Sequence, residues 1–229
     1  MLLEDLKTHA QTGILYRDGT FDMYIVKESA GYFPLGLKPD DVVLDIGGHV
    51  GTFASRCVNE CPQVAENIVS YEAESTNAEV LAFNATKFGF NSYNTAVVDD
   101  SYEGDSIDVW RNPGKNNAMH ATAKRRGRTD SHPVGVMRLG QLVDAVLPTV
   151  VKCDIEGGEY AFNWPVVLAL PGAAKIRKIV IEYHLGTKNG KKRAAEIHEQ
   201  IIAAGFAVTK APNFIGAAWA TLGFYDRAV

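Results

Sequence analysis

The sequence has little cysteine, and the few cysteines are not spaced for pairing. It contains 3 in 229 residues, an odd number, and Cys57 and Cys61 are separated by three residues rather than two. A disulfide framework and a zinc ribbon are therefore not expected. We predict that these two residues and Cys153 are buried or half-buried thiols in a reducing compartment.

Long apolar runs and a strong charge of one sign are also missing. No apolar run approaches the length that crosses a membrane, and residues 1–11 lack the apolar core of a signal peptide. We therefore expect a cytoplasmic protein. The net charge of −4 does not indicate binding to nucleic acid or membranes. One basic run, residues 124–128, is predicted to be a solvated loop, with contact to phosphate or nucleic acid as the alternative.

From residue 41 onward, strand and helix patterns alternate. This rhythm predicts an α/β fold with a parallel doubly wound sheet, which binds ligands outside the carboxyl ends of its strands. We see no internal repeat. The predicted strands are 42–44, 68–71, 93–98, 149–153 and 178–181, and the predicted helices are 51–60, 75–89 with Ser75 as N-cap, 139–146 and 191–204, with a further helix near Tyr160.

Three segments do not follow this rhythm. Apolar alternation on both sides of residues 17–20, which contain Asp-Gly, predicts an N-terminal β-hairpin. Residues 206–209 and 219–225 should form a closing antiparallel pair. The polar stretch 99–133 is predicted to be an inserted loop with one strand at 106–110. We therefore expect a helix and hairpin extension over 1–40 and a single domain over 41–229.

Residues 45–51, Asp-Ile-Gly-Gly-His-Val-Gly, form a glycine-rich turn between the first core strand and its helix. Glycine permits sharp turns and close approach of a ligand, and the helix start offers free N–H groups. These features are general to nucleotide sites. Glu72, at the end of the next strand, adds a carboxylate that can accept both hydroxyls of a ribose. A turn that only permits tight packing is the alternative.

Asp45 discriminates between two cofactors. An acid just before the turn would repel the pyrophosphate of a dinucleotide, whereas it would attract the sulfonium and ammonium groups of S-adenosylmethionine. The turn therefore favours S-adenosylmethionine over a nicotinamide cofactor.

A second polar constellation follows the strand at 149–153. Asp154, Glu156 and Glu159 leave its carboxyl end, and Glu182 and His184 end the next strand on the same rim. A helix expected near Glu159 would favour an acid at its start.

These motifs together resemble one family. Residues 45–53 resemble the cofactor motif of FkbM-type methyltransferases, residues 71–73 its aromatic-Glu-small element, residues 152–159 its Lys-x-Asp-x-Glu-Gly-x-Glu motif, and residues 182–184 its Glu-x-His ending. The matches occur in family order over about 42–184. His49 departs from the pattern, which leads us to expect Asn. The resemblance implies a Rossmann-like class I methyltransferase fold with a mostly parallel seven-stranded sheet, S-adenosylmethionine as donor, and O-methylation of a hydroxyl or carboxyl on a sugar or other small metabolite.

The predicted roles are as follows. We expect His184 or Asp154 to be the general base, with Glu159 as a further catalytic residue; a purely structural hydrogen-bonded imidazole is the alternative for His184. The acceptor pocket is predicted to include His120, Asn117 and Glu156. The cofactor is predicted to contact Asp45, Gly47, Gly48, His49, Gly51, Glu72, Ala73 and Asp154.

Three alternatives remain open. Asp154, Glu156, Glu159 and His184 offer ligands for a divalent metal, although the resemblance implies no required metal. An RNA 2′-O-methyltransferase would need catalytic lysines around the strand-end acid, and Lys152 is expected to lie too deep. A non-catalytic nucleotide-binding module is the third. We expect a small-molecule acceptor as partner and no membrane, and a homo-oligomer is left open.

Overall fold

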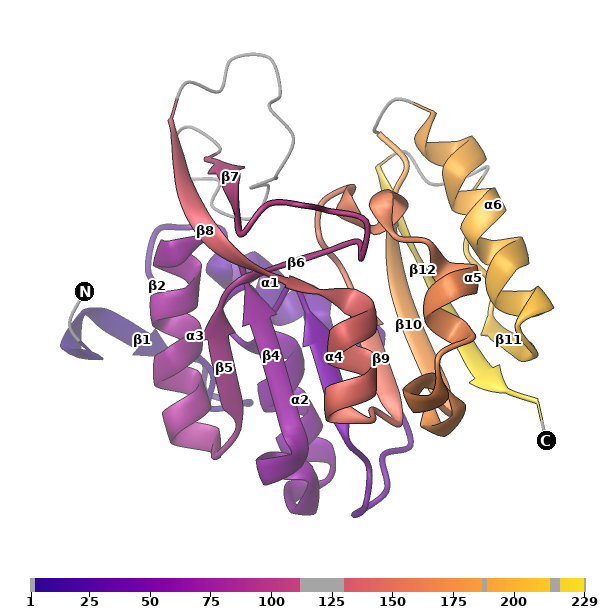
Figure 1. Cartoon of the computed structure of the whole chain (residues 1–229). Coiled ribbons are helices and arrows are strands. Elements are labelled where there is room, and N and C mark those ends of the chain that lie inside the picture. Colours follow the sequence, from indigo (N-terminus) through magenta and orange to yellow (C-terminus); the bar gives the residue numbers. More distant parts are fainter. Residues whose placement is uncertain (1–2, 112–129, 187–188, 215–218, 229) are drawn as a thin grey trace. The chain divides into compact units, whose positions relative to one another are not determined.

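The computed structural model describes residues 3–111, 130–186, 189–214 and 219–228. Its main sheet has seven strands in the order β11-β12-β10-β9-β3-β4-β5 (Figure 1). β9 pairs in parallel with β3 and β10, β4 pairs in parallel with β5, and β12 is antiparallel to β10 and β11. The predicted α/β sheet and its closing antiparallel pair are confirmed. The strands are β3 (Val43–Ile46), β4 (Ile68–Glu72), β5 (Asn91–Asn94), β9 (Val150–Cys153), β10 (Lys178–His184), β11 (Phe206–Lys210) and β12 (Ala220–Arg227).

The central strands β3 and β9 are covered on both faces. All four residues of β3 and all four of β9 are buried, as expected for strands inside a parallel sheet. The helices between the strands match the predicted ones within a few residues. They are α2 (Thr52–Glu60), α3 (Ser75–Phe88), α4 (Leu139–Val146), α5 (Trp164–Leu168) and α6 (Gly190–Ala203), with a 3₁₀ turn, Gly158–Ala161, near Tyr160.

Helix α3 begins one residue differently from the prediction. Its N-cap is Glu74 rather than Ser75, and the Glu74 side chain accepts a hydrogen bond from the backbone N–H of Asn77. A carboxylate satisfies a free helix N–H and also interacts favourably with the helix dipole, so it displaces the serine from this position. The helix ends at Gly89, which has a left-handed φ of 81° as a C-cap glycine often does.

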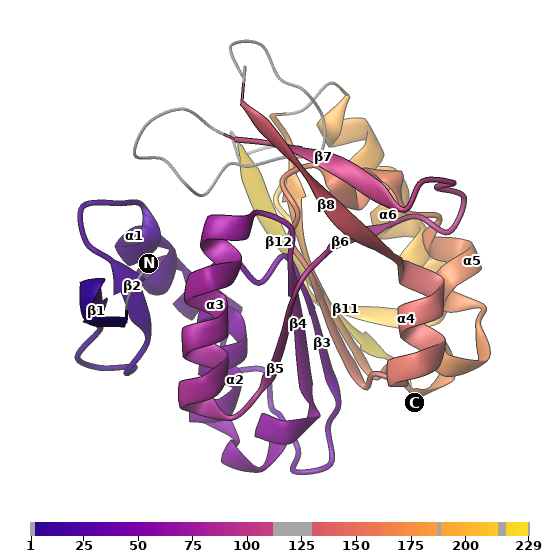
Figure 2. The ribbon, with the colours of Figure 1, turned by 60° about the vertical axis from the view of Figure 1, so that its left-hand side comes forward.

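The N-terminal hairpin exists, but with other arms than predicted. β1 (Leu6–Thr8) pairs with β2 (Leu15–Arg17), and residues expected to form the second arm form helix α1 (Asp22–Glu28) instead. The buried residues of α1 are Asp22 and Val26, four apart, which is the helical period. Alternation of apolar residues was therefore the wrong reading of this segment. Figure 2 shows α1 with β1 and β2.

The predicted insertion contains more strand than expected. The strand predicted at 93–98 divides between β5 and β6 (Ala96–Val98), and β8 (Ser131–Arg138) begins inside the expected loop. Strands β6 and β8 form a second sheet with the predicted strand β7 (Ser106–Trp110), in the order β6-β8-β7. Its buried residues Ala96, Val109 and Val134 pack together, and this cluster is the physical reason for the extra strand. His120, Asn117 and residues 124–128 lie outside the described residues.

The contacts of the chain fall into two compact units. The first contains residues 1–41, 47–96 and 104–136, and the second contains residues 42–46, 97–103 and 137–229. Cys57, Cys61 and Cys153 are all free and buried, which confirms the predicted burial of these thiols. Across the described ranges, no helix combines the length and apolar character needed to cross a bilayer.

Candidate functional site

In the glycine-rich turn of the first unit, every second residue has a left-handed backbone. Gly47, His49 and Gly51 have φ values of 82°, 51° and 88°. The backbone N–H groups of Gly47 and Gly48 both donate to the carbonyl oxygen of Tyr71 at 2.9 Å. These bonds fix the turn against the end of β4, so its shape is set before any ligand arrives.

Gly51 is needed for packing as well as for its backbone angle. A Cβ atom there would lie 3.0 Å from Cδ1 of Leu81 and 3.3 Å from Cβ of Asn84, both on α3. Gly51 also precedes α2 as its N-cap. The structural reading of this glycine, close approach of two helices, thus has direct geometric support, and its predicted contact with a cofactor stays a prediction.

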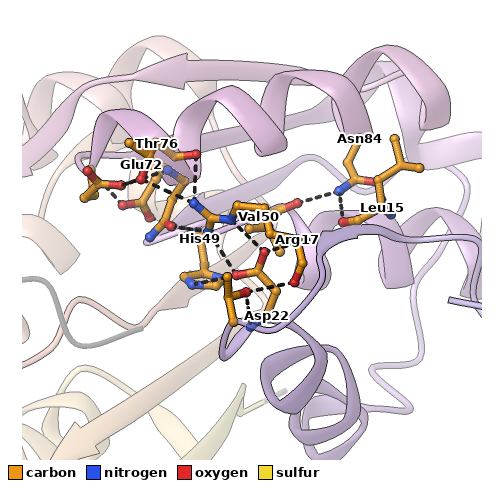
Figure 3. Close-up of polar contacts among 11 residues, drawn as sticks. Leu15, Arg17, Asp22, His49, Val50, Glu72, Thr76 and Asn84 are labelled. Atoms are coloured by element: carbon orange, nitrogen blue, oxygen red, sulfur yellow. Dashed lines mark hydrogen bonds and ion pairs between the residues drawn. The ribbon is translucent and has the colours of Figure 1, made fainter. Parts of the chain in front are cut away.

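Glu72 holds the turn from the end of β4. One carboxylate oxygen, Oε2, accepts the backbone N–H of His49 at 2.8 Å, and the other, Oε1, accepts the backbone N–H of Glu74 at 2.8 Å (Figure 3). The residue is 9% exposed. A carboxylate has about four lone-pair positions, so these two bonds orient the group without exhausting its capacity to accept hydroxyl protons. Ala73, beside it, packs against the cluster of the small sheet.

In the second unit, a buried lysine lies between two acids. Asp45 in β3 stands opposite Lys152 in the parallel register with β9. Nζ of Lys152 lies 3.3 Å from Oδ1 of Asp45 and 3.5 Å from Oδ2 of Asp154. Burial alone would lower the pKa of Lys152, but the charges of Asp45 and Asp154 raise it above its ordinary value. The charge of Asp45 is therefore compensated by Lys152, so its attraction for a sulfonium is weaker than the sequence alone suggests.

The second group in this unit is centred on His184. Glu159, fully buried, accepts both the backbone N–H of His184 (3.0 Å) and a hydrogen bond with its ring Nδ1 (3.1 Å). Nε2 lies 3.7 Å from Oδ1 of Asp154 and 3.8 Å from Oε2 of Glu156. Burial would lower the pKa of His184, but the three carboxylates, Glu159 first, raise it to about 10.

At neutral pH His184 is therefore an imidazolium. A protonated ring has no lone pair with which to take a proton, so Asp154, 26% exposed at its side chain, is the better candidate base. The structure brings together Asp154, Glu156, Glu159 and His184, all of which the sequence placed on this rim. Within the described parts of the chain, no group of three or more His, Cys, Asp or Glu side chains is arranged to hold a metal ion.

Two residues next to the glycine turn were not predicted. Asp22 and Arg17, from the N-terminal segment, form an ion pair in which the carboxylate is fully buried. Oδ1 of Asp22 also lies 3.9 Å from Nε2 of His49. The only sequence signal was an acid five residues after an arginine. This spacing indicates no ligand by itself, and the expected strand at 21–26 does not place Asp22 near the glycine turn.

The sequence matches no protein-family profile, and no curated protein matches it. Solved structures do share its fold. An FkbM methyltransferase from Methylobacillus flagellatus KT aligns with a TM-score of 0.53 at 14% identity over 86% of this chain and 47% of its own. A precorrin-6y C5,15-methyltransferase from Geobacter metallireducens GS-15 aligns with a TM-score of 0.48 at 13% identity over 98% of this chain and 94% of its own.

The chain thus spans about half the length of the FkbM structure that it resembles. At this level of identity the likeness concerns the fold. The order of the seven strands, the helices between them and this alignment agree in identifying the fold as the Rossmann-like fold of class I methyltransferases.

Proposed function

We propose that this chain is an S-adenosylmethionine-dependent methyltransferase that methylates a hydroxyl or carboxyl oxygen on a sugar or other small metabolite. The observation that carries the proposal is the carboxylate of Glu72. It is fixed by two backbone N–H groups at the end of β4, next to a turn that is bonded to the same strand. This is the arrangement with which a class I fold binds the ribose of a nucleoside.

The chemistry of the donors fits this cofactor. Glu72 offers acceptors to two ribose hydroxyls, and Gly47 and Gly48 present backbone without side chains. In the first unit we assign Gly47, Gly48, His49 and Glu72 to the cofactor. When bound, the cofactor supplies an electrophilic methyl group on a sulfonium. The contribution of the chain is to align the acceptor and to remove its proton, and alignment alone can supply several kcal/mol.

We assign proton removal to Asp154. Its carboxylate is partly exposed, and Lys152 and His184 lie close enough to orient it. The fully buried Glu159 holds His184 in place and is therefore assigned a positioning role. Glu156, with a left-handed φ of 57°, is retained as a predicted contact of the acceptor.

Calorimetry with S-adenosylhomocysteine and with NAD tests the cofactor. We expect the wild-type protein to bind the first and not the second. Glu72→Gln should weaken binding at least tenfold, because it removes a charged acceptor, about 1.5–3 kcal/mol for hydrogen bonds to a charged group. Glu79→Ala, at an exposed position of α3, is the control and should bind as the wild type does. Binding of NAD alone would contradict the proposal and favour a different nucleotide-binding function.

The role of Asp154 as general base is tested by measuring the release of S-adenosylhomocysteine in the presence of sugar and metabolite acceptors. With an acceptor that the wild type methylates, Asp154→Asn should reduce kcat about a hundredfold while cofactor affinity stays the same, since a general base typically contributes ~10²–10⁴. Glu196→Gln, at a side chain of α6 that is 54% exposed, is the control and should keep full turnover. Full turnover by the folded Asp154→Asn protein would remove this residue from the mechanism. Methylation of RNA with steeply salt-dependent binding would instead support the nucleic-acid alternative.

A further inference from the structure

An ion pair from the N-terminal segment lies beside the glycine turn, within the first unit. The carboxylate of Asp22 is fully buried and receives Nε of Arg17 at 2.8 Å and Nη2 at 2.9 Å, a two-pronged contact. The backbone N–H of Arg17 also donates to Oδ2 of Asp22, at 2.9 Å. Burial alone would raise the pKa of Asp22, but the hydrogen bonds and charge of Arg17 and the charge of His49 lower it. Asp22 is therefore an anion at neutral pH.

This pair is anchored to helix α3. Nη2 of Arg17 donates to Oδ1 of Asn77 at 2.6 Å, and Nη1 donates to the carbonyl oxygen of Thr76 at 3.2 Å. Figure 3 shows Arg17 lying between Asp22 and Thr76. The position of Asp22 is thus fixed by the start of the same helix that follows β4 and Glu72.

A second contact joins the same segment to the turn. Asn84, fully buried in α3, donates from Nδ2 to the carbonyl oxygens of Leu15 (2.9 Å) and Val50 (2.7 Å), and its Oδ1 accepts the N–H of Leu15 at 2.8 Å (Figure 3). The residue before Val50 is His49. Its backbone is therefore held from one side by Asn84 through Val50 and from the other by Glu72.

His49 connects the Arg17–Asp22 ion pair to Glu72, the carboxylate that we assign to binding the cofactor. Its ring Nε2 lies 3.9 Å from Oδ1 of Asp22, and its backbone N–H donates to Oε2 of Glu72 at 2.8 Å. The left-handed conformation of His49 is strained in a non-glycine residue and persists only where the surroundings enforce it. The buried anion on one side and Glu72 on the other provide that enforcement.

We propose that Asp22, held by Arg17, is a positioning residue of the cofactor site. It attracts the His49 side chain and so keeps the His49 N–H directed at Glu72, the carboxylate assigned to the ribose. The inference rests on the proposed function. It also gives a role to the one residue of the turn that departs from the FkbM-type motif, since the shorter side chain of asparagine would not reach Asp22 in the same way.

A double-mutant cycle tests the proposal, with the affinity for S-adenosylhomocysteine measured by calorimetry. Asp22→Asn and His49→Asn should each weaken binding about tenfold, and the double variant should be no weaker than either single variant, because both changes break one connection. Independent contributions of the two side chains would instead give additive losses. Additive losses, or wild-type affinity in Asp22→Asn, would overturn the inference.

Two controls keep the outcome interpretable. Asp18→Asn, in the turn between β2 and α1 and with a side chain 69% exposed, should bind as the wild type does. Thermal unfolding of each variant shows whether it is folded, and if Asp22→Asn is not, wild-type affinity in His49→Asn alone overturns the inference. A wild-type protein that binds no S-adenosylhomocysteine refutes the proposed function itself, whereas unchanged affinity in the variants refutes only the role of Asp22.

Discussion

Replacing Lys152 with methionine is expected to lower the free energy of unfolding by about 3–5 kcal/mol, the usual effect of breaking a buried ion pair from one side. The side chain of Lys152 is 3% exposed and that of its partner Asp45 is fully buried. Methionine nearly preserves the volume, so the loss comes from the carboxylate of Asp45, which is left without its cation in the core. Urea denaturation at neutral pH measures the effect.

The double variant Asp45→Asn/Lys152→Met separates charge from packing. If the uncompensated carboxylate causes the loss, removing it as well should restore most of the stability, since replacing a whole buried pair by neutral groups is often nearly neutral. Lys192→Met is the surface control. Its side chain is 79% exposed and pairs with Glu196 at i,i+4, so a change within about 0.5 kcal/mol is expected. Equal stability of the single and double Lys152 variants would refute the explanation.

The stability that His184 contributes should decline between pH 6.5 and about 10. The folded-state pKa of about 10 lies above the ordinary value of 6.5, so the folded protein holds the proton more tightly than the unfolded chain. The contribution is therefore complete below pH 6.5, and it is lost as pH rises towards 10. A pKa difference of this size corresponds to about 5 kcal/mol.

The comparison with His184→Gln isolates this contribution, because other groups titrate equally in both proteins. The wild type should exceed the variant in unfolding free energy at pH 6, and the two curves should converge towards pH 10. In Glu159→Gln the imidazole should titrate at a lower pH, which the NMR shift of its ring protons reports, because Glu159 makes the largest favourable contribution to the raised pKa. Parallel stability curves across this range would contradict the assigned charge.

The sheet could be predicted because its strands carry two independent signals. Residues 42–44 and 150–151 are apolar and mostly β-branched, and a glycine turn or acids follow each strand at its carboxyl end. The same logic located the rim residues, since the ends of neighbouring parallel strands meet at one edge. Asp154 and His184 are thus found close together although they are thirty positions apart in the chain.

The partners of these residues could not be predicted in the same way. The pairing of Asp45 with Lys152 depends on the register between β3 and β9, and a register one residue away would separate them. The proximity of Asp22 to His49 depends on how the N-terminal segment returns to α3, and local pattern carries no information on that path. It was further obscured because apolar residues in α1 happened to alternate. The raised pKa of His184 follows from three such long-range contacts at once.

The buried amide of Asn84 also bears on where this protein can be shortened. Residues before the first core strand look expendable on the sequence, yet Leu15 provides both a donor and an acceptor to an amide that has no access to water. A version starting after residue 40 would lose both of these hydrogen bonds, each about 0.5–1.5 kcal/mol net, and would open the part of α3 that contacts Leu15 to water. The hairpin and α1 are therefore integral to the folding unit, and fusion partners or affinity tags belong before them rather than in their place.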